Sequence, residues 1–133
     1  MNREIKFRIW DIPNQEWLKY KYLEGTWKYE HEESGASSSL QHCLDNPIDF
    51  IVVQFTGLKD KNLVEIYEGD IIDNGSLPRV VVFHDGNYWA QTKVDEYLIT
   101  KNIGLWQYIV NFKAVKIGTI HEDPELLKIK KNV

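Results

Sequence analysis

The stretch QFTGLKDKNLVEIYEGDII, residues 54–72, carries the strongest fold signal in the sequence. Apolar side chains alternate with polar ones on both sides of a short charged run, and this alternation is typical of half-buried β-strands. Gly69 is followed directly by Asp70, which indicates a tight turn, because glycine supplies the backbone angle and an aspartate carboxylate accepts hydrogen bonds from nearby amides. The stretch therefore predicts strands that meet at a sharp turn, as at the corner of a β-barrel, with Asp70 as the acceptor in that turn.

The size and composition fit one globular domain. The chain has 133 residues, 43% of them apolar, which allows one core and excludes a wholly disordered chain. Cys43 is the only cysteine, so an intrachain disulfide and a cysteine-based zinc site are excluded, and a reducing compartment is expected. The N-terminus carries charge where a signal peptide needs an apolar run, and no segment approaches the roughly 20 apolar residues of a membrane span. We expect a cytoplasmic protein without membrane association.

Alternation elsewhere extends the β assignment over most of the chain. Residues 1–30 predict a short antiparallel meander, residues 31–47 a loop or linker with one helical turn, and residues 48–133 the barrel-like part of a single domain. Residues 94–112 remain open, because their apolar positions fit either one helix or two strands. The expected fold class is mainly β, an N-terminal meander plus a barrel, with little helix.

The charge distribution bears on nucleic-acid binding. The formal net charge is −4, and residues 30–70 contain two basic and nine acidic residues. A broad duplex-DNA footprint requires a basic face that displaces counterions. We therefore expect weak or no binding to duplex DNA.

The titratable residues match no recognisable catalytic or metal-binding motif. His42 and Cys43 are adjacent, so in a strand their side chains would face opposite sides and could not form a dyad. His31 stands among acidic residues, but its spacing to His42 matches no zinc motif. The sequence also lacks the phosphate-binding loop and the nucleophile-elbow pattern. We expect no catalytic residue, no metal site and no cofactor.

The aromatic residues are the candidates for binding. Five tryptophans and seven tyrosines are many for this length. Tyr88, Trp89 and Trp106 are binding candidates that could stack on bases or contact a partner protein, although such residues more often belong to a core or a subunit interface. Trp10 and Trp17 fall on strand faces opposite to their apolar neighbours, so one core cannot take every ring. We expect a homo-oligomer of unspecified order to cover the surplus.

Four blocks of the sequence together resemble the YopX family, small proteins encoded by phages and prophages. The blocks are REIKFRIWD (residues 3–11), the opening stretch (54–72), VVVFHDG (80–86) and KIGTIHEDPELL (116–127). They appear in order over nearly the whole chain. The sequence departs from the family pattern at Leu63 and Val64, where Gly-Lys is usual.

This resemblance implies a mainly β fold with an SH3-like barrel that begins near residues 66–72, and it implies a phage or prophage origin. It does not imply a mechanism. Its most specific block supplies the residues that we expect to form a structural signature, namely Gly57, Asp60, Glu68, Gly69 and Asp70.

Two classes of function fit the sequence. The first is a non-enzymatic phage or prophage accessory protein that acts as a protein-interaction module toward a host or phage protein. The alternative is a nucleic-acid-binding barrel protein. Aromatic residues surrounded by Lys and Arg would favour nucleic acid, and aromatic residues surrounded by Asp and Glu would favour a protein partner. The acidic character of residues 30–70 favours the first class.

Overall fold

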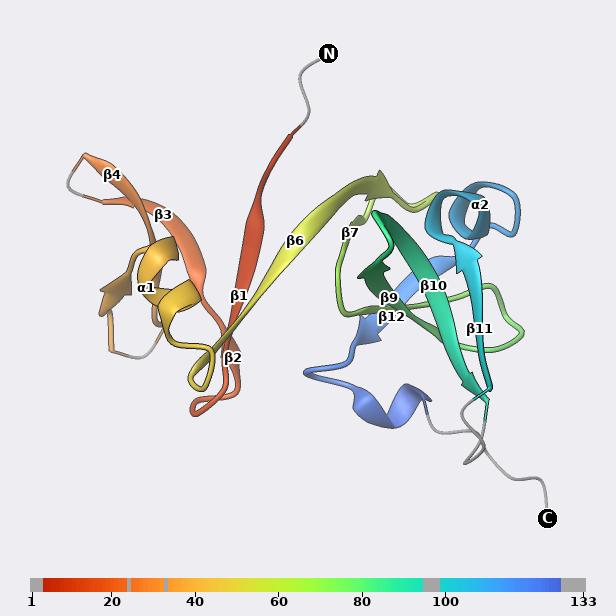
Figure 1. The fold of residues 1–133 in the computed structure, drawn as a ribbon. Helices are drawn as coiled ribbons and strands as arrows, with labels where there is room; N and C mark the ends of the chain where they lie inside the picture. Colours follow the sequence, from red (N-terminus) through yellow and green to blue (C-terminus); the bar gives the residue numbers. More distant parts are fainter. Residues whose placement is uncertain (1–3, 24, 33, 95–98, 128–133) are drawn as a thin grey trace. The chain divides into compact units, whose positions relative to one another are not determined.

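The computed structural model describes residues 4–23, 25–32, 34–94 and 99–127. This part of the chain is mainly β with little helix, as expected from the alternation (Figure 1). No helix in these ranges has the length and apolar character that a membrane span requires. The elements in chain order are β1 (Phe7–Asp11), β2 (Glu16–Trp17), β3 (Lys19–Leu23), β4 (Thr26–Glu30), β5 (Ser37–Ser38), α1 (Leu40–Asp45), β6 (Phe50–Lys59), β7 (Glu65–Tyr67), β8 (Asp70–Asp73), β9 (Arg79–His84), β10 (Asn87–Val94), β11 (Ile99–Gly104), α2 (Leu105–Val110), β12 (Val115–Thr119) and the 3₁₀-helix η1 (Pro124–Leu127).

Two compact units make up the chain. The N-terminal unit comprises Ile5–Gln54, and the C-terminal unit contains the chain from Phe55 onward. The boundary lies inside β6, so this one strand pairs within both units. Residues 31–47, expected as a loop or linker with a helical turn, contain β5 and α1 and belong to the N-terminal unit.

The N-terminal unit packs two small antiparallel sheets and one short helix around a shared core. β1 lies between β2 and β6, and β3, β4 and β5 form the second sheet. Helix α1 begins after Ser39, whose hydroxyl accepts a hydrogen bond from the His42 amide at 3.1 Å and so caps the first turn. The buried residues of this core come from both sheets and the helix, and they are Ile9, Leu18, Tyr29, Cys43 and Phe50.

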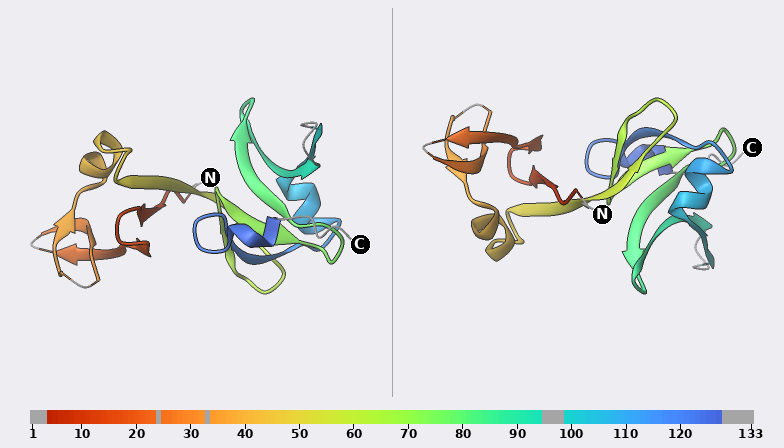
Figure 2. Two further views of the ribbon diagram at one scale, coloured as in Figure 1. Left: turned by 90° about the horizontal axis from the view of Figure 1, so that it is seen from below. Right: turned by 90° about the horizontal axis from the view of Figure 1, so that it is seen from above.

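The C-terminal unit contains a curled antiparallel sheet that forms a half-barrel. Its strand order is β11-β10-β9-β8-β12, and β7 pairs with the second half of β6. The curvature is visible in β10 from both directions in Figure 2. The core combines strand residues with one side of α2, and its buried members are Ile66, Ile72, Val81, Ala90, Leu105, Tyr108, Ile109 and Ala114.

Residues 94–112 contain a strand followed by a helix, rather than one helix or two strands. β11 pairs with β10 along its length, with Ile103 opposite Ala90. Helix α2 follows directly, and its buried residues recur at the three- and four-residue spacing of a helix. Gly104 is the point of change, because it ends the strand and is the N-cap of the helix. Residues 95–98 lie outside the described part of the chain.

Candidate functional site

Asp70 of the expected signature is a structural residue. The residue is 1% exposed, and its Oδ2 accepts a hydrogen bond from the Tyr67 amide at 2.7 Å, which confirms the expected role in the turn at Gly69. The same oxygen lies 3.2 Å from the Lys116 ammonium group of β12. The turn at Gly69 is therefore stabilised by the hydrogen bond that Asp70 accepts within it and by the contact of Asp70 with Lys116 of β12.

Asp60 is also buried, and it makes contacts of the same kind. Its Oδ1 accepts hydrogen bonds from the amides of Asn62 and Val64, at 2.8 and 3.1 Å, and these bonds close the charged turn. Its Oδ2 accepts a hydrogen bond from the Lys116 amide at 3.0 Å. Lys116 therefore contacts both signature aspartates, one through its backbone and one through its ammonium group. Because both carboxylates are engaged in the fold, neither is available for acid–base work.

The remaining signature residues lie in the same turns. Gly57 has a φ of +86° where the pairing of β6 with β7 shifts register, which fits a glycine at a bulge. Gly69 has the same φ, and its carbonyl accepts a hydrogen bond from the Ile120 amide at 2.9 Å. Burial raises the pKa of the Glu68 carboxyl above its usual value, and burial lowers the pKa of the nearby His121 imidazole. The latter ring lies so close to Gly69 that a Cβ there would be 3.2 Å from its Nε2.

His42 and Cys43 lie in α1 rather than in a strand. Cys43 is completely buried, whereas His42 is exposed on the helix surface. Burial, together with the nearby Asp11 carboxylate, raises the pKa of the Cys43 thiol to about 11. The thiol is therefore protonated at neutral pH, and a protonated thiol is a poor nucleophile and a poor metal ligand.

The structure groups His31 with Asp11 and Glu16 rather than with the acidic residues beside it in the sequence. One ligand atom from each of the three lies within 4.8 Å of the others. However, Asp11 Oδ2 already lies 3.0 Å from His31 Nδ1 and accepts a hydrogen bond from the Asn14 side-chain amide at 2.8 Å. These two contacts explain why His31 and Asn14 lie beside Asp11, which is buried and needs hydrogen-bond partners.

The three aromatic candidates from the sequence do not form one surface. Tyr88 and Trp89 are consecutive in β10, so their side chains lie on opposite faces of the sheet. The Tyr88 ring packs against the core and the Phe83 ring, whereas the Trp89 indole stacks on His84 and donates a hydrogen bond to the His84 carbonyl at 3.0 Å. Trp106 belongs to α2 and is 59% exposed. The rings of Tyr88 and Trp89 are thus packed against other residues of the protein. The Trp106 side chain is exposed on α2.

Four other aromatic side chains come together on the hairpin of β3 and β4. The strand register places Tyr20 opposite Tyr29 and Tyr22 opposite Trp27, so all four project from one face. The Tyr20 ring is stacked against Trp27 at 4.7 Å and against Tyr29 at 4.8 Å, and the Tyr22 ring meets Trp27 edge to face at 5.5 Å. We call these four residues the aromatic row. Tyr20, Tyr22 and Trp27 are 52%, 61% and 55% exposed, although each is large and aromatic.

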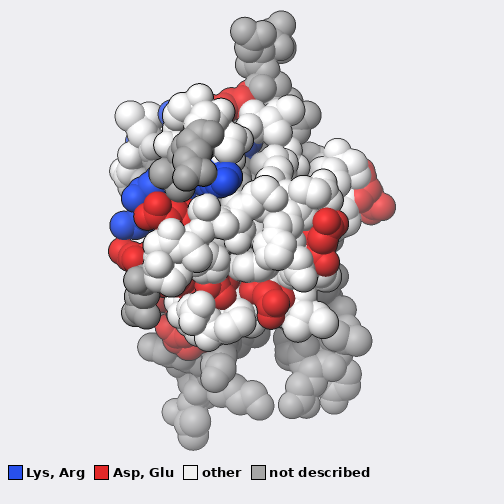
Figure 3. All heavy atoms as spheres, turned by 90° about the vertical axis from the view of Figure 1, so that its left-hand side faces the viewer, with Lys and Arg blue, Asp and Glu red and all other residues white. Residues whose placement is uncertain are grey.

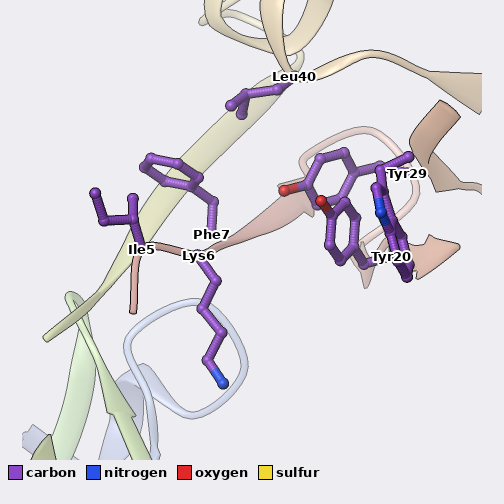
Figure 4. Close-up of a pocket in the computed structure, with 7 residues that line it drawn as sticks. Ile5, Lys6, Phe7, Tyr20, Tyr29 and Leu40 are labelled. Carbon is purple, nitrogen blue, oxygen red and sulfur yellow. The ribbon is translucent and has the colours of Figure 1, made fainter. Parts of the chain in front are cut away.

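A small hollow adjoins the aromatic row in the N-terminal unit. Its volume is about 180 Å³. Phe7 and Leu40 lie on one side of it, and Tyr20 and Tyr29 lie on the other (Figure 4). Lys6 is the only charged residue in its lining. The hollow is smaller than the roughly 300–1,000 Å³ of typical small-molecule sites.

Two of the three lysines on the same hairpin form ion pairs with glutamates. The Lys19 ammonium group lies 3.2 Å from a Glu32 carboxylate oxygen, and the Lys21 ammonium group lies 2.9 Å from Glu30. Alternation places Lys19 and Lys21 on the face opposite to the aromatic row. On the face of the molecule drawn in Figure 3, basic and acidic side chains adjoin within a largely uncharged surface. The lysines of β3 are therefore paired with glutamates and lie on the face opposite to the row.

The sequence pattern around Gly25 indicates the aromatic row once the pairing of the two strands is known. In KYKYLEGTWKYE, residues 19–30, aromatic residues alternate with lysines on both sides of Gly25. Pairing the two halves about that glycine places tyrosine opposite tyrosine and tyrosine opposite tryptophan. The alternation identifies two strands, but the cross-strand register is needed to show that their rings share a face.

Comparisons with known proteins agree with the sequence resemblance. The model of the family described as YopX protein matches residues 6–128 of the chain. The crystal structure of protein EF1440 from Enterococcus faecalis is similar to this chain, with 26% sequence identity, coverage of 96% of this chain and 100% of that chain, and a TM-score of 0.61. A search of the curated proteins finds no match.

Proposed function

Because the chain belongs to the YopX family, we propose that it is a non-enzymatic protein-interaction module that binds through the aromatic row and the hollow beside it. In this proposal it is a phage or prophage accessory protein that acts in the cytoplasm of a bacterial host on a host or phage protein. The origin follows from the family resemblance, and the mode of action follows from the surface chemistry of the N-terminal unit.

One observation carries the proposal. Three large aromatic side chains, Tyr20, Tyr22 and Trp27, are each more than half exposed on one face of a hairpin. Leaving so much apolar ring surface in water gains nothing for folding. Tyrosine and tryptophan are enriched where proteins bind one another, and they dominate the energy of such interfaces when a partner covers them. The adjoining hollow offers a place for one anchoring side chain.

The state of the chemically active groups supports a non-enzymatic role. The Asp60 and Asp70 carboxylates are buried in hydrogen bonds with the backbone. The Cys43 thiol is buried and protonated at neutral pH. A nucleophile needs a base within hydrogen-bond reach, and a general base needs access to substrate. These three groups meet neither requirement.

The alternative, a nucleic-acid-binding barrel protein, fits the aromatic row less well. A base stacks on a free ring face. The Tyr20 ring is stacked against both Trp27 and Tyr29, at 4.7 and 4.8 Å, so less of it is free to stack on a base. The hairpin cations Lys19 and Lys21 are paired with glutamates, which weakens their attraction for phosphate. A protein partner needs only the exposed ring edges and the hollow.

Affinity purification with matched variants tests the proposal. Trp27 and Trp106 are 55% and 59% exposed, so Trp27→Ser and Trp106→Ser remove equally accessible indoles from different units. The tagged full chain is used to isolate partners from a bacterial lysate, and each partner is then purified and titrated by calorimetry. We expect Trp27→Ser to weaken the binding at least tenfold, about 1.4 kcal/mol, because a buried tryptophan is a frequent hot spot. Trp106→Ser should bind like the unaltered protein.

Two outcomes would contradict the proposal. One is a specific partner whose affinity falls with Trp106→Ser and is unaffected by Trp27→Ser. The other is saturable binding of a single-stranded dT oligonucleotide that quenches tryptophan fluorescence in the unaltered protein and is lost in Trp27→Ser. The second result would support the nucleic-acid alternative.

We also propose that the chain forms a homo-oligomer. The support is the exposed aromatic residues outside the aromatic row, Phe83, Trp106 and Phe112, because pairing of identical copies is a common way to cover such residues. Light scattering at tens of micromolar should give a mass well above the 15.7 kDa of one chain. A mass near that value would contradict the proposal.

A further inference from the structure

A second hollow lies on the C-terminal unit, between two segments that are far apart in the sequence. Its volume is about 410 Å³. One wall comes from the end of β6 and the turn after it, and the other comes from the end of α2 and the residues that follow. The lining residues are Lys59, Asp60, Lys61, Ile109, Val110 and Lys113. We call this hollow and its lining the lysine surface.

The lysine surface presents positive charge outward. Lys59, Lys61 and Lys113 are all exposed, and none of them forms an ion pair with another residue in the described ranges. The one carboxylate in the lining belongs to Asp60, which is 4% exposed and accepts backbone amide hydrogen bonds through both oxygens. Three cations therefore surround the hollow, and outside its lining Glu65 lies opposite Lys59 in the pairing of β6 with β7.

The centre of the lysine surface is apolar. Ile109 is 7% exposed and belongs to the core of the C-terminal unit, whereas the neighbouring Val110 is 48% exposed. The tip of the turn that supplies Lys59 and Lys61 carries Leu63, which is 77% exposed. An inorganic anion would satisfy the lysines and leave this apolar surface uncovered. The combination fits a ligand that has both negative charge and an apolar group.

The backbone beside the hollow is strained at two positions. Leu63 and Lys113 have φ values of +64° and +55°, in the left-handed region that favours glycine. Each residue is exposed, so packing of its side chain does not offset the unfavourable backbone angle. Gln15 and Asp85 have similar φ values in exposed turns away from the hollow, so the backbone angle by itself does not mark a site. At Leu63 and Lys113 the chain keeps a large side chain, one apolar and one cationic, where glycine would be more stable.

We propose that the lysine surface docks an acidic, extended segment of a partner protein. One large apolar side chain of that segment lies in the hollow against Ile109 and Val110, and flanking carboxylates meet Lys59, Lys61 and Lys113. Charge complementarity selects the acidic segment, since opposite charges across an interface determine partner choice and speed association. The apolar side chains of Ile109 and Val110 favour an apolar residue between the acidic residues of the segment. This surface is separate from the aromatic row and does not depend on the function proposed for it.

Selection from a displayed library of random twelve-residue peptides on the immobilised full chain tests the proposal while the partner is unidentified. The enriched peptides should carry several Asp or Glu residues around a Leu, Ile, Phe or Trp. The most enriched peptide is then synthesised and titrated against the full chain and two double variants. Lys61→Glu/Lys113→Glu should bind at least tenfold more weakly. Lys19→Glu/Lys28→Glu makes the same change in net charge on the N-terminal unit, and it should alter the affinity less than twofold.

The variant Lys113→Gly tests both the backbone angle at this position and the contribution of the lysine to peptide binding. Lys113→Gly should raise the urea midpoint of the C-terminal unit, because glycine relieves the left-handed backbone angle. The same variant should weaken the selected peptide at least threefold, because one cation is lost. A purely structural role for Lys113 predicts no change in peptide affinity, so an unchanged affinity would overturn its part in the site.

Several results would overturn the proposal as a whole. They are an enrichment of peptides without acidic residues, a failure to enrich any peptide, and equal loss of binding in the two double variants. Tighter, salt-sensitive binding of a dT oligonucleotide at these lysines would assign the surface to nucleic acid. Chemical-shift changes at the same lysines on concentrating the protein alone would assign it to a second copy of this chain.

Discussion

The turns of the C-terminal unit and the hairpin of the N-terminal unit use their conspicuous residues in opposite ways. In the turns, the Asp60 and Asp70 carboxylates are buried and both contact Lys116. In the hairpin, Tyr22 and Trp27 are more than half exposed. The two aspartates of a distinctive motif thus stabilise the fold, while an ordinary-looking alternation of tyrosine and lysine leaves large aromatic side chains exposed. A distinctive motif is therefore weak evidence for an active site.

The largest expected effect is on the structural side of this comparison. Asp70→Ala removes the acceptor for the Tyr67 amide and leaves the Lys116 ammonium group, whose side chain is 18% exposed, without that carboxylate. Breaking a buried ion pair from one side typically costs about 3–5 kcal/mol. We expect a loss near the lower end of that range, about 3 kcal/mol, in urea unfolding of the C-terminal unit.

Asp73→Ala is the control for this prediction. Asp73 also follows the turn, but its Oδ1 accepts one exposed hydrogen bond, from the Gly75 amide at 3.0 Å. Its loss should cost about 1 kcal/mol or less. Equal losses for the two aspartates would mean that the contacts of Asp70 with Tyr67 and Lys116 contribute no special stability.

A smaller effect is expected where β12 approaches η1. A Cβ placed on Gly118 would lie 2.5 Å from Asp123 Oδ2 and 3.0 Å from Leu126 Cδ1. Gly118→Ala should therefore cost about 1–3 kcal/mol, the usual range for overpacking. Gly104→Ala is a matched control, because a Cβ there meets nothing within 4 Å. The measurement is the urea midpoint of each variant, and similar shifts in both would remove overpacking as the explanation.

The pH dependence should show a contribution from His121. Burial lowers the pKa of this imidazole below its ordinary value of 6.5, so the unfolded chain binds a proton more readily than the folded chain. The stability contributed by the neutral ring is therefore complete above about pH 6.5 and is lost as the pH falls below it. His121→Asn should flatten the free energy of unfolding over this acidic range. A variant that keeps the full pH dependence of the unaltered protein would show that His121 does not cause it.

Much of the fold could be predicted from local patterns in the sequence. Alternation identified the strands of the opening stretch, and the Gly69-Asp70 pair identified both the turn and the hydrogen-bond acceptor in it. These features depend on neighbours in the chain. The contact of Asp70 with Lys116 and the pairing of β1 with β6 depend on residues far apart in the sequence, and alternation shows which face a residue occupies but not which strand lies beside it.

The aromatic row could not be predicted from alternation for the same reason. The sequence offers Tyr88, Trp89 and Trp106 as binding candidates, but consecutive strand residues face opposite ways, and Trp106 belongs to a helix. The aromatic row needed the register of β3 with β4, which places Tyr22 opposite Trp27. The exposure of these side chains also cannot be predicted from the sequence, because alternation alone does not show which face of a small sheet is covered.

The smallest effect on stability is expected for the aromatic row itself. Tyr22→Ser removes one edge-to-face contact with Trp27 and a side chain that is 61% exposed. An aromatic pair contributes about 0.5–1.5 kcal/mol, and for an exposed pair we expect the lower part of that range in urea unfolding of the N-terminal unit. A loss as large as that of Asp70→Ala would show that the row is a structural element and would end the contrast between the two regions.

The most direct test of the interaction surface is photo-crosslinking in bacterial cells with benzoylphenylalanine placed at position 22 of the full chain. Tyr22 is among the most exposed aromatic residues of the row, so a bound partner should lie within reach of the reactive ketone. We predict a discrete, nuclease-resistant product that contains one other protein, and no such product when the same group replaces Trp106. A product at position 106 alone, or a nuclease-sensitive product at position 22, would contradict the assignment of the aromatic row as a protein-binding surface.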